Sequence, residues 1–292
     1  MRSNPEECEE GNTNFPGLFR ELSWLSGEMF HLVFPILTKV NGKKSWSRYF
    51  CRMSALTGTD PTRKVRKILG WSILIMFVLG IYAEATRTAF IDWSDPQVTW
   101  INIAKSRLGY SFMIIAFIVI IFLDTVIAIG VLTIFRTRNG FLVTLTAALR
   151  LVYVAIKGVA LTGLFMAGGL YFGEEYTQES GSQALTNLKS HQYGFSVGLI
   201  LFGLHLILLA RVARLTQCPK WIPWILWSAG LGYVINSLAS LLIDDAVTQS
   251  VIIGVFIVPM TFSEIVFFLW LWRKGFSGDQ TIALSQPSPD PA

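Results

Sequence analysis

The chain has 292 residues, of which 52% are hydrophobic and only 15% are charged, and its formal net charge is +5. A soluble domain usually carries about 25% charged residues. This composition excludes an ordinary water-soluble domain and indicates a surface that faces lipid. The basic residues lie at the ends of apolar runs, as membrane topology signals do, so we expect no nucleic-acid partner.

The first 60 residues are predicted to be an N-terminal extension. It opens with an acidic, polar stretch, which is not a signal peptide. The apolar run Phe15–Thr38 is broken by charges and by Pro35, so we expect a helix that lies in the membrane interface, with a seventh span as the alternative. The basic stretch Lys39–Lys67 is interpreted mainly as a topology signal, and binding of anionic lipid there is the alternative.

Residues 61–275 are predicted to form an all-α, six-helix integral membrane bundle. Each apolar run is long enough to cross a hydrocarbon core of about 30 Å. The predicted spans are Leu69–Ile91, Leu108–Phe135, Phe141–Phe172, Gly194–Ala213, Trp221–Ile243 and Val251–Trp272. The third is too long for one vertical crossing and should tilt, kink or project. Residues 276–292 are rich in Ser and Pro, which is typical of a disordered tail.

The distribution of basic residues predicts the topology. With the N-terminus in the cytoplasm, the inner segments from Lys39 onward hold sixteen Lys and Arg residues and the outer loops hold three. Because cytoplasmic loops carry an excess of Lys and Arg, we expect both termini inside. All three cysteines then face the cytoplasm, and no disulfide is expected.

Four polar residues share one depth in four different spans. Asp124, Arg150, His205 and Glu264 lie nine to eleven residues from the cytoplasmic end of their spans. At 1.5 Å per residue this is about 14–17 Å, close to the midplane. Ionisable groups at this depth are costly unless they face the interior and pair. We therefore predict a ligand-binding cluster in which the two acids neutralise Arg150. A structural charge network, with His205 as a core histidine, is the alternative.

A second polar layer is predicted nearer the outer face. Glu84 and Arg87 are three residues apart on one helix and should pair locally. His191 is expected at the mouth of the fourth span. The layer comprises Glu84, Arg87, Lys157, His191 and Asn236, which would line a polar path from the outer surface. Gly163-x-x-x-Ala167 and Gly194-x-x-x-Gly198 are small-residue pairs that favour close helix packing.

Known catalytic motifs are missing. The sequence contains no phosphate-binding glycine loop, no H-E-x-x-H pair and no G-x-S-x-G. With three histidines in the chain, we expect no metal site, and catalytic residues and cofactor remain open.

Three functions stay open at this point. The leading hypothesis is a membrane protein that binds, and in one version translocates, a small polar solute or a proton. The second is a non-catalytic subunit of a larger pigment or redox complex with partner membrane proteins. The third is an intramembrane lipid-modifying enzyme. Whether the chain is an enzyme stays open, and the interpretation as a non-enzyme is preferred.

The run His191–His205, HQYGFSVGLILFGLH, resembles a hallmark of a mainly bacterial multi-pass family, domain of unknown function 4386. Ala147–Leu151 and the segment Gly230–Tyr233 are similar to other segments of that family. The resemblance covers about Pro61 to Gly275, and Leu215–Cys218 departs from the family pattern. It implies a six-span bundle in a bacterial cytoplasmic membrane and no established reaction.

Overall fold

The computed structural model describes residues 61–136, 139–173, 175–216, 218–243 and 245–274, all within the unit Asp60–Ala292. Several expectations lie outside the described residues. They are the interfacial helix at Phe15–Thr38, the basic stretch Lys39–Lys67 as far as residue 60, and the tail over 276–292.

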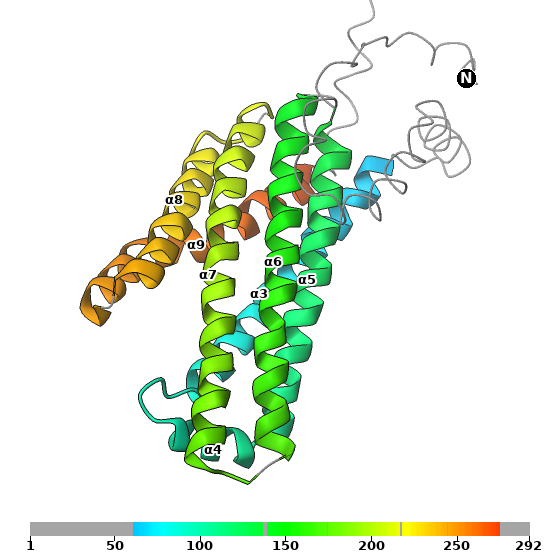
Figure 1. Ribbon diagram of the computed structural model, residues 1–292. Coiled ribbons are helices and arrows are strands. Elements are labelled where there is room, and N and C mark those ends of the chain that lie inside the picture. Colours follow the sequence, from blue (N-terminus) through cyan, green and yellow to red (C-terminus); the bar gives the residue numbers. More distant parts are fainter. Residues whose placement is uncertain (1–60, 137–138, 174, 217, 244, 275–292) are drawn as a thin grey trace, which may run out of the picture. The chain divides into compact units, whose positions relative to one another are not determined.

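The described residues form helices joined by short connections and contain no strand (Figure 1). Six of the helices are long and apolar enough to cross a membrane, which confirms the predicted all-α six-helix bundle. The helices are α3 (Pro61–Phe90), α4 (Pro96–Lys105), α5 (Arg107–Phe135), α6 (Gly140–Gly173), α7 (Gln178–Arg214), α8 (Trp221–Leu242) and α9 (Ala246–Lys274).

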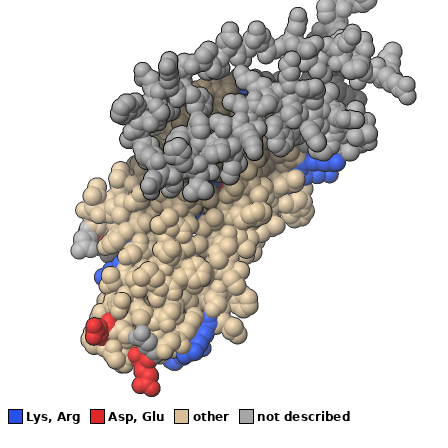
Figure 2. Space-filling model, turned by 45° about the vertical axis from the view of Figure 1, so that its right-hand side comes forward, with Lys and Arg blue, Asp and Glu red and all other residues tan. Residues whose placement is uncertain are grey.

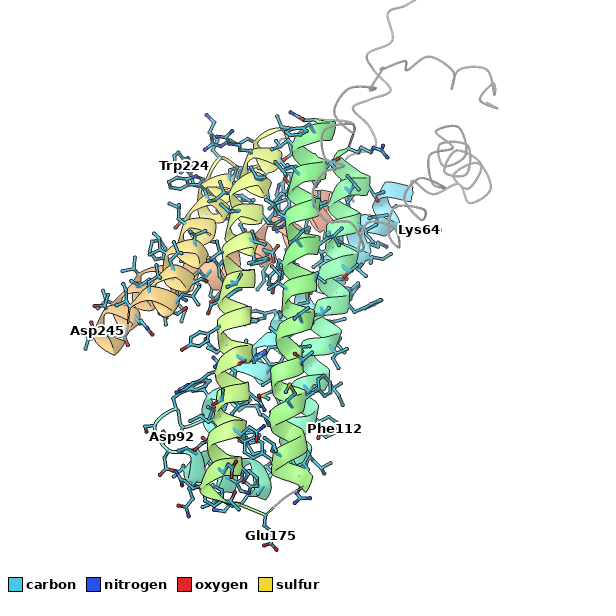
Figure 3. All side chains as sticks on the ribbon, viewed as in Figure 1. Lys64, Asp92, Phe112, Glu175, Trp224 and Asp245 are labelled. Carbon is cyan, nitrogen blue, oxygen red and sulfur yellow. The ribbon has the colours of Figure 1, made fainter. Side chains whose placement is uncertain are left out.

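The six long helices close into a ring. Each packs against the next in the order α3, α5, α6, α7, α8, α9, and α9 returns to α3. We call the end that carries α4, Asp92 and Glu175 the α4 end, and the end that carries Lys64 and Trp224 the basic end (Figure 3). Because the number of crossings is even, the described bundle begins and finishes at the basic end.

The outer surface of the bundle is apolar. Large hydrophobic side chains such as Leu108, Phe122 and Val159 are more than 60% exposed. On the face shown in Figure 2, charged residues form small patches separated by a broad uncharged surface. Exposure of this extent is an aggregation hazard in water, whereas lipid accepts it. The protein is therefore an integral membrane protein that lies in a lipid bilayer.

The interior is divided into two apolar clusters. One, nearer the basic end, includes Leu69, Phe135 and Phe267. The other, nearer the α4 end, includes Trp100 and Tyr171. Buried charged residues, among them Asp124 and Arg150, also lie in the interior, whereas large hydrophobic side chains are exposed on the surface.

Small residues set the closest helix contacts. A methyl group built on Gly203 of α7 would lie 2.6 Å from the carbonyl oxygen of Gly230 on α8, and the reverse contact is also 2.6 Å. On α6, a methyl group on Gly163 would lie 2.5 Å from the Asn187 carbonyl oxygen of α7. Both backbones thus approach within contact distance, as small-residue pairs in membrane helices predict.

Two elements differ from the predictions. Helix α7 begins at Gln178, well before the predicted span at Gly194, because Thr177 and Ser180 form a capping box that starts the helix in a polar segment. Helix α4 was not predicted. Its signals are Asp95, whose side chain accepts from two backbone N–H groups, and Pro96 in the first helical turn.

Candidate functional site

Arg150 on α6 lies at the centre of the charged layer. Its Nε and Nη2 donate to Asp124 Oδ1 on α5 at 3.1 and 2.6 Å. Nη2 also donates to Glu264 Oε2 on α9 at 3.2 Å, and Nη1 donates to Glu264 Oε1. The Arg150 side chain is fully buried. Burial of a guanidinium requires this kind of pairing, and here it joins three helices.

His205 on α7 supports Arg150 from the other side. Its Nε2 lies 3.2 Å from Arg150 Nη1, and its Nδ1 lies 2.7 Å from the Thr146 carbonyl oxygen. A guanidinium only donates and a carbonyl only accepts. Nε2 therefore accepts, and Nδ1 carries the proton. Both ring nitrogens of His205 are therefore engaged in hydrogen bonds inside the bundle, and the ring holds the Arg150 guanidinium on the side away from Asp124.

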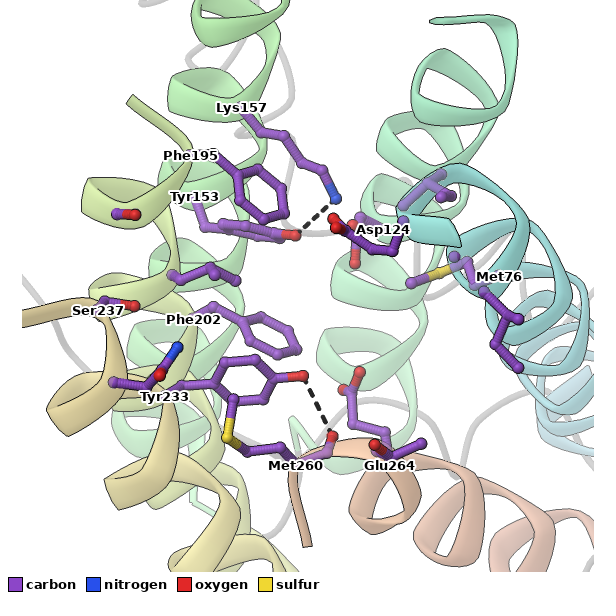
Figure 4. Close-up of a pocket in the computed structure, with 18 of the residues that line it drawn as sticks. Met76, Asp124, Tyr153, Lys157, Phe195, Phe202, Tyr233, Ser237, Met260 and Glu264 are labelled. Carbon is purple, nitrogen blue, oxygen red and sulfur yellow. Dashed lines mark hydrogen bonds between the residues drawn. The ribbon is translucent and has the colours of Figure 1, made fainter. Parts of the chain in front are cut away.

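A cavity of about 600 Å³ adjoins this layer and is lined by residues of all six long helices (Figure 4). Six of the nine predicted site residues line it, namely Glu84, Arg87, Asp124, Lys157, Asn236 and Glu264. Arg150 and His205 lie behind the wall. The sequence placed all four residues of the midplane cluster at one depth, and the structure brings them into contact, but only its two acids face the cavity.

Two buried polar atoms at this cavity lack a partner among the described residues. They are Oδ2 of Asp124 and Oγ of Ser237. Both side chains are about 1% exposed, and both residues line the cavity. A buried polar atom without a hydrogen bond costs about 1–3 kcal/mol, and more when it is charged. A donor to Asp124 Oδ2 and a polar partner for Ser237 Oγ would remove this cost.

Lys157 on α6 is enclosed by aromatic rings. Its Nζ donates to Tyr153 Oη at 2.8 Å and lies 5.1 Å from the ring centre of Phe195, 5.2 Å from that of Tyr153 and 5.9 Å from that of Phe117. Attraction to ring faces stabilises an ammonium at such distances. Lys157 and Asp124 point toward the same space in Figure 4. The side chain is 4% exposed, so it does not extend outward to water.

The rim of the cavity nearer the α4 end carries a second ion pair. Arg87 Nε donates to Glu84 Oε2 at 2.9 Å, which confirms the predicted local pair. Arg87 Nη1 also donates to Gln192 Oε1 of α7 at 2.9 Å. The Arg87 side chain is 19% exposed and the Glu84 side chain is 43% exposed. The pair thus links α3 to α7 at the opening.

The placement of His191 differs from the prediction. It was expected at the mouth of a span, but it is 2% exposed, and its Nδ1 donates to the Ala160 carbonyl oxygen of α6 at 2.9 Å. It also stacks on Phe195. Because α7 starts earlier than predicted, His191 lies inside the α6–α7 contact and does not line the cavity.

Several lining residues were missed from the sequence. Tyr153 is three residues beyond Arg150 and therefore on the same helix face, which was a usable signal. Ser237 on α8 directly follows the predicted site residue Asn236. Gln192 and Ser196 come from α7, and Ser196 accepts a hydrogen bond from Ser240 of α8 at 3.1 Å. Their roles depend on contacts between helices, which spacing along one helix does not give.

The part of the chain described by the structure contains no group of three His, Cys, Asp or Glu side chains placed to hold a metal ion. The polar groups at the cavity are carboxylates, an ammonium, a guanidinium, hydroxyls and amides. This set can bind a ligand through hydrogen bonds and charge.

A family model, Domain of unknown function (DUF4386), matches residues 68–275, more than half of the chain. The chain belongs to this family. The match begins in α3 and extends beyond the last residue of α9, so the DUF4386 region contains all nine predicted site residues and the whole cavity wall. No curated protein and no solved structure matches the chain.

Proposed function

We propose that this multi-pass DUF4386 protein binds a small polar ligand in the cavity between its six helices. The observation that carries the proposal is that Asp124 lines the cavity and that its buried Oδ2 has no partner among the described residues. A carboxylate held at the bilayer centre is functional by default, and one with an unused acceptor atom requires a donor. A bound ligand, or water that a ligand displaces, supplies that donor.

The formal charges at the cavity balance. Asp124 and Glu264 are offset by Arg150 and Lys157, and Glu84 is offset by Arg87. A cavity without net charge favours a neutral or zwitterionic ligand, because an isolated ion would pay its desolvation cost without a countercharge. This balance argues against a simple inorganic cation or anion as the ligand.

Access to the cavity is asymmetric. The side toward the basic end is closed by apolar residues of the first cluster, among them Phe267 and Phe268, which are fully buried. The other side carries the partly exposed Glu84–Arg87 pair. The ligand would therefore enter from the half nearer the α4 end, and translocation would require a second arrangement of the helices.

We also propose that the basic end faces the cytoplasm. Arg136, Arg211, Arg214, Lys220 and Arg273 lie at or next to helix ends there, and cytoplasmic segments are enriched in such residues. A membrane-impermeant maleimide applied to intact cells should label Glu175→Cys but not Lys220→Cys. The opposite pattern would reverse this topology.

The binding proposal is tested by chemical access to the cavity. Ser237 and Ser263 are both 1% exposed, and neither Oγ has a partner among the described residues, but only Ser237 lines the cavity. In a chain with its native cysteines replaced by serine, the water-soluble thiol reagent methanethiosulfonate ethylammonium should modify Ser237→Cys at least about tenfold faster than Ser263→Cys. Equal, slow rates would show that polar molecules do not reach the cavity and would overturn the proposal.

A further inference from the structure

The cavity has a side opening between α3 and α9. These two helices touch toward the basic end, where the rings of Trp71 and Trp272 lie 5.5 Å apart and those of Phe77 and Phe262 lie 6.0 Å apart. One turn further along α3, Gly80 lines the cavity and has no atom within 4 Å of a built Cβ. These ring contacts thus lie on the basic-end side of Gly80, and space remains beside Gly80 itself.

The rim of this opening is apolar and faces outward. Ile81 on α3 and Ile253 and Ile257 on α9 all line the cavity. They are also 56%, 42% and 51% exposed. A side chain that both lines a cavity and is exposed on the bundle surface stands at the opening. Because that surface faces lipid, the opening connects the polar interior to the acyl-chain region.

Two charged residues in the cavity, Asp124 and Lys157, keep unused hydrogen-bonding capacity among the described residues. Asp124 offers its free Oδ2, and Lys157 offers an ammonium with three protons, for which Tyr153 is its one hydrogen-bond acceptor among the described residues. A ligand that satisfies both needs a donor and an acceptor of its own. An ammonium paired with an anionic group meets this need and keeps the site neutral.

We propose that the ligand is an amphiphile with a zwitterionic head group and an acyl chain, entering from the lipid between α3 and α9. Its ammonium contacts Asp124, its anionic group contacts Lys157, and its chain lies along Ile81, Ile253 and Ile257. The proposal rests on the proposed function, since it names the ligand class of the same cavity. A volume of about 600 Å³ falls within the range of pockets that hold ligands of this size.

The test compares three probes on the full chain in bilayer discs of phosphatidylglycerol. Lysophosphatidylethanolamine carries the zwitterionic head and one chain, glycerophosphoethanolamine carries the same head without a chain, and lysophosphatidylglycerol carries a chain with an anionic head. We expect saturable binding of the first at least about tenfold tighter than of the other two.

Single substitutions test whether the probe binds at this opening and at Asp124. Gly80→Trp places a large side chain at the opening, where a Cβ meets open space, and should weaken lysophosphatidylethanolamine binding about tenfold or more. Gly158→Trp on α6 is the matched control, since Gly158 also has no atom within 4 Å and does not line the cavity. Ile81→Trp tests the same opening at an exposed position if Gly80→Trp fails to fold. Asp124→Asn should weaken binding by a similar factor.

Each other result overturns the inference in a distinguishable way. Equal affinity for glycerophosphoethanolamine would leave a polar ligand site intact but would remove the acyl chain and the side entry. Equal affinity for lysophosphatidylglycerol would remove the zwitterionic requirement. Binding that Asp124→Asn and Gly80→Trp leave unchanged would be non-specific lipid contact. No binding of any probe, with Ser237→Cys still modified, would refute the amphiphile and retain the proposed function.

Discussion

Replacing Arg150 by methionine would leave two buried carboxylates without their shared cation. Arg150→Met removes five donated hydrogen bonds, two to Asp124, two to Glu264 and one to His205. Removing one partner of a buried ion pair typically costs about 3–5 kcal/mol, because the remaining charge stays uncompensated. In membrane proteins the unfolded reference also finds polar partners, which lowers such costs. We therefore expect a loss of about 3 kcal/mol in the free energy of unfolding.

Reversible unfolding in mixed micelles with increasing dodecyl sulfate, followed by circular dichroism, measures this loss. Arg87→Met is the matched control. Arg87 also pairs with a carboxylate, but its partner Glu84 is 43% exposed, and exposed pairs are worth about 0–1 kcal/mol. Both variants remove an arginine from a pair with an acid. The ratio of their losses in unfolding free energy therefore reports the effect of burial.

A triple variant separates the charge effect from the loss of side-chain volume. Asp124→Asn and Glu264→Gln added to Arg150→Met remove all three charges, and a neutral replacement of a buried ion cluster is often tolerated. We expect the triple variant to recover most of the lost stability. If Arg150→Met costs less than about 1 kcal/mol, or if the triple variant is no more stable than Arg150→Met, the stated cause is wrong.

Three further predictions concern packing, tautomer and charge. Gly203→Ala should destabilise by about 1–3 kcal/mol, because the added methyl would overlap a backbone carbonyl at 2.6 Å, whereas Gly158→Ala meets open space and should be neutral or stabilising in the same unfolding assay. In nitrogen NMR spectra at neutral pH, His205 should show a protonated Nδ1 and an unprotonated Nε2, and the reverse tautomer would contradict the Arg150 contact. Hydrogen bonds from Ser94 hold the pKa of Asp92 below its usual value, so Ser94→Ala should raise that pKa in a carbon NMR titration. The ionised form is the one favoured by folding, so this contribution is present above the ordinary Asp pKa and is lost as the pH falls through the lowered value.

Depth along a helix could be predicted from the sequence, whereas rotation about its axis could not. The rise of 1.5 Å per residue placed Asp124, Arg150, His205 and Glu264 at one level, and the structure joins them there. Which of them face the cavity depends on how each helix is turned by its neighbours. His205 is turned toward the Thr146 carbonyl and lies behind the wall. Ligand binding at this cluster stays a prediction.

Helix ends were predicted less well than helix centres. Hydropathy marks where an apolar run begins, but α7 begins where its first N–H groups find acceptors, at the Thr177 cap. That difference moved His191 from a water boundary to a helix contact. The aromatic enclosure of Lys157 could not be predicted from the sequence either, because Phe117 and Phe195 belong to other helices.

The unequal lengths of neighbouring helices create a site to which an antibody fragment can bind. Helices α7 and α8 are joined by the short turn at the basic end, but α7 has 37 residues and α8 has 22. At 1.5 Å per residue, α7 therefore extends about 20 Å further toward the α4 end. There it packs with the 34-residue α6 and with α4. A chain of 32.7 kDa gives little contrast of its own inside a detergent belt. An antibody fragment raised against this extended hairpin of α6 and α7 would supply an alignment mark for electron cryomicroscopy of the protein with its ligand in place.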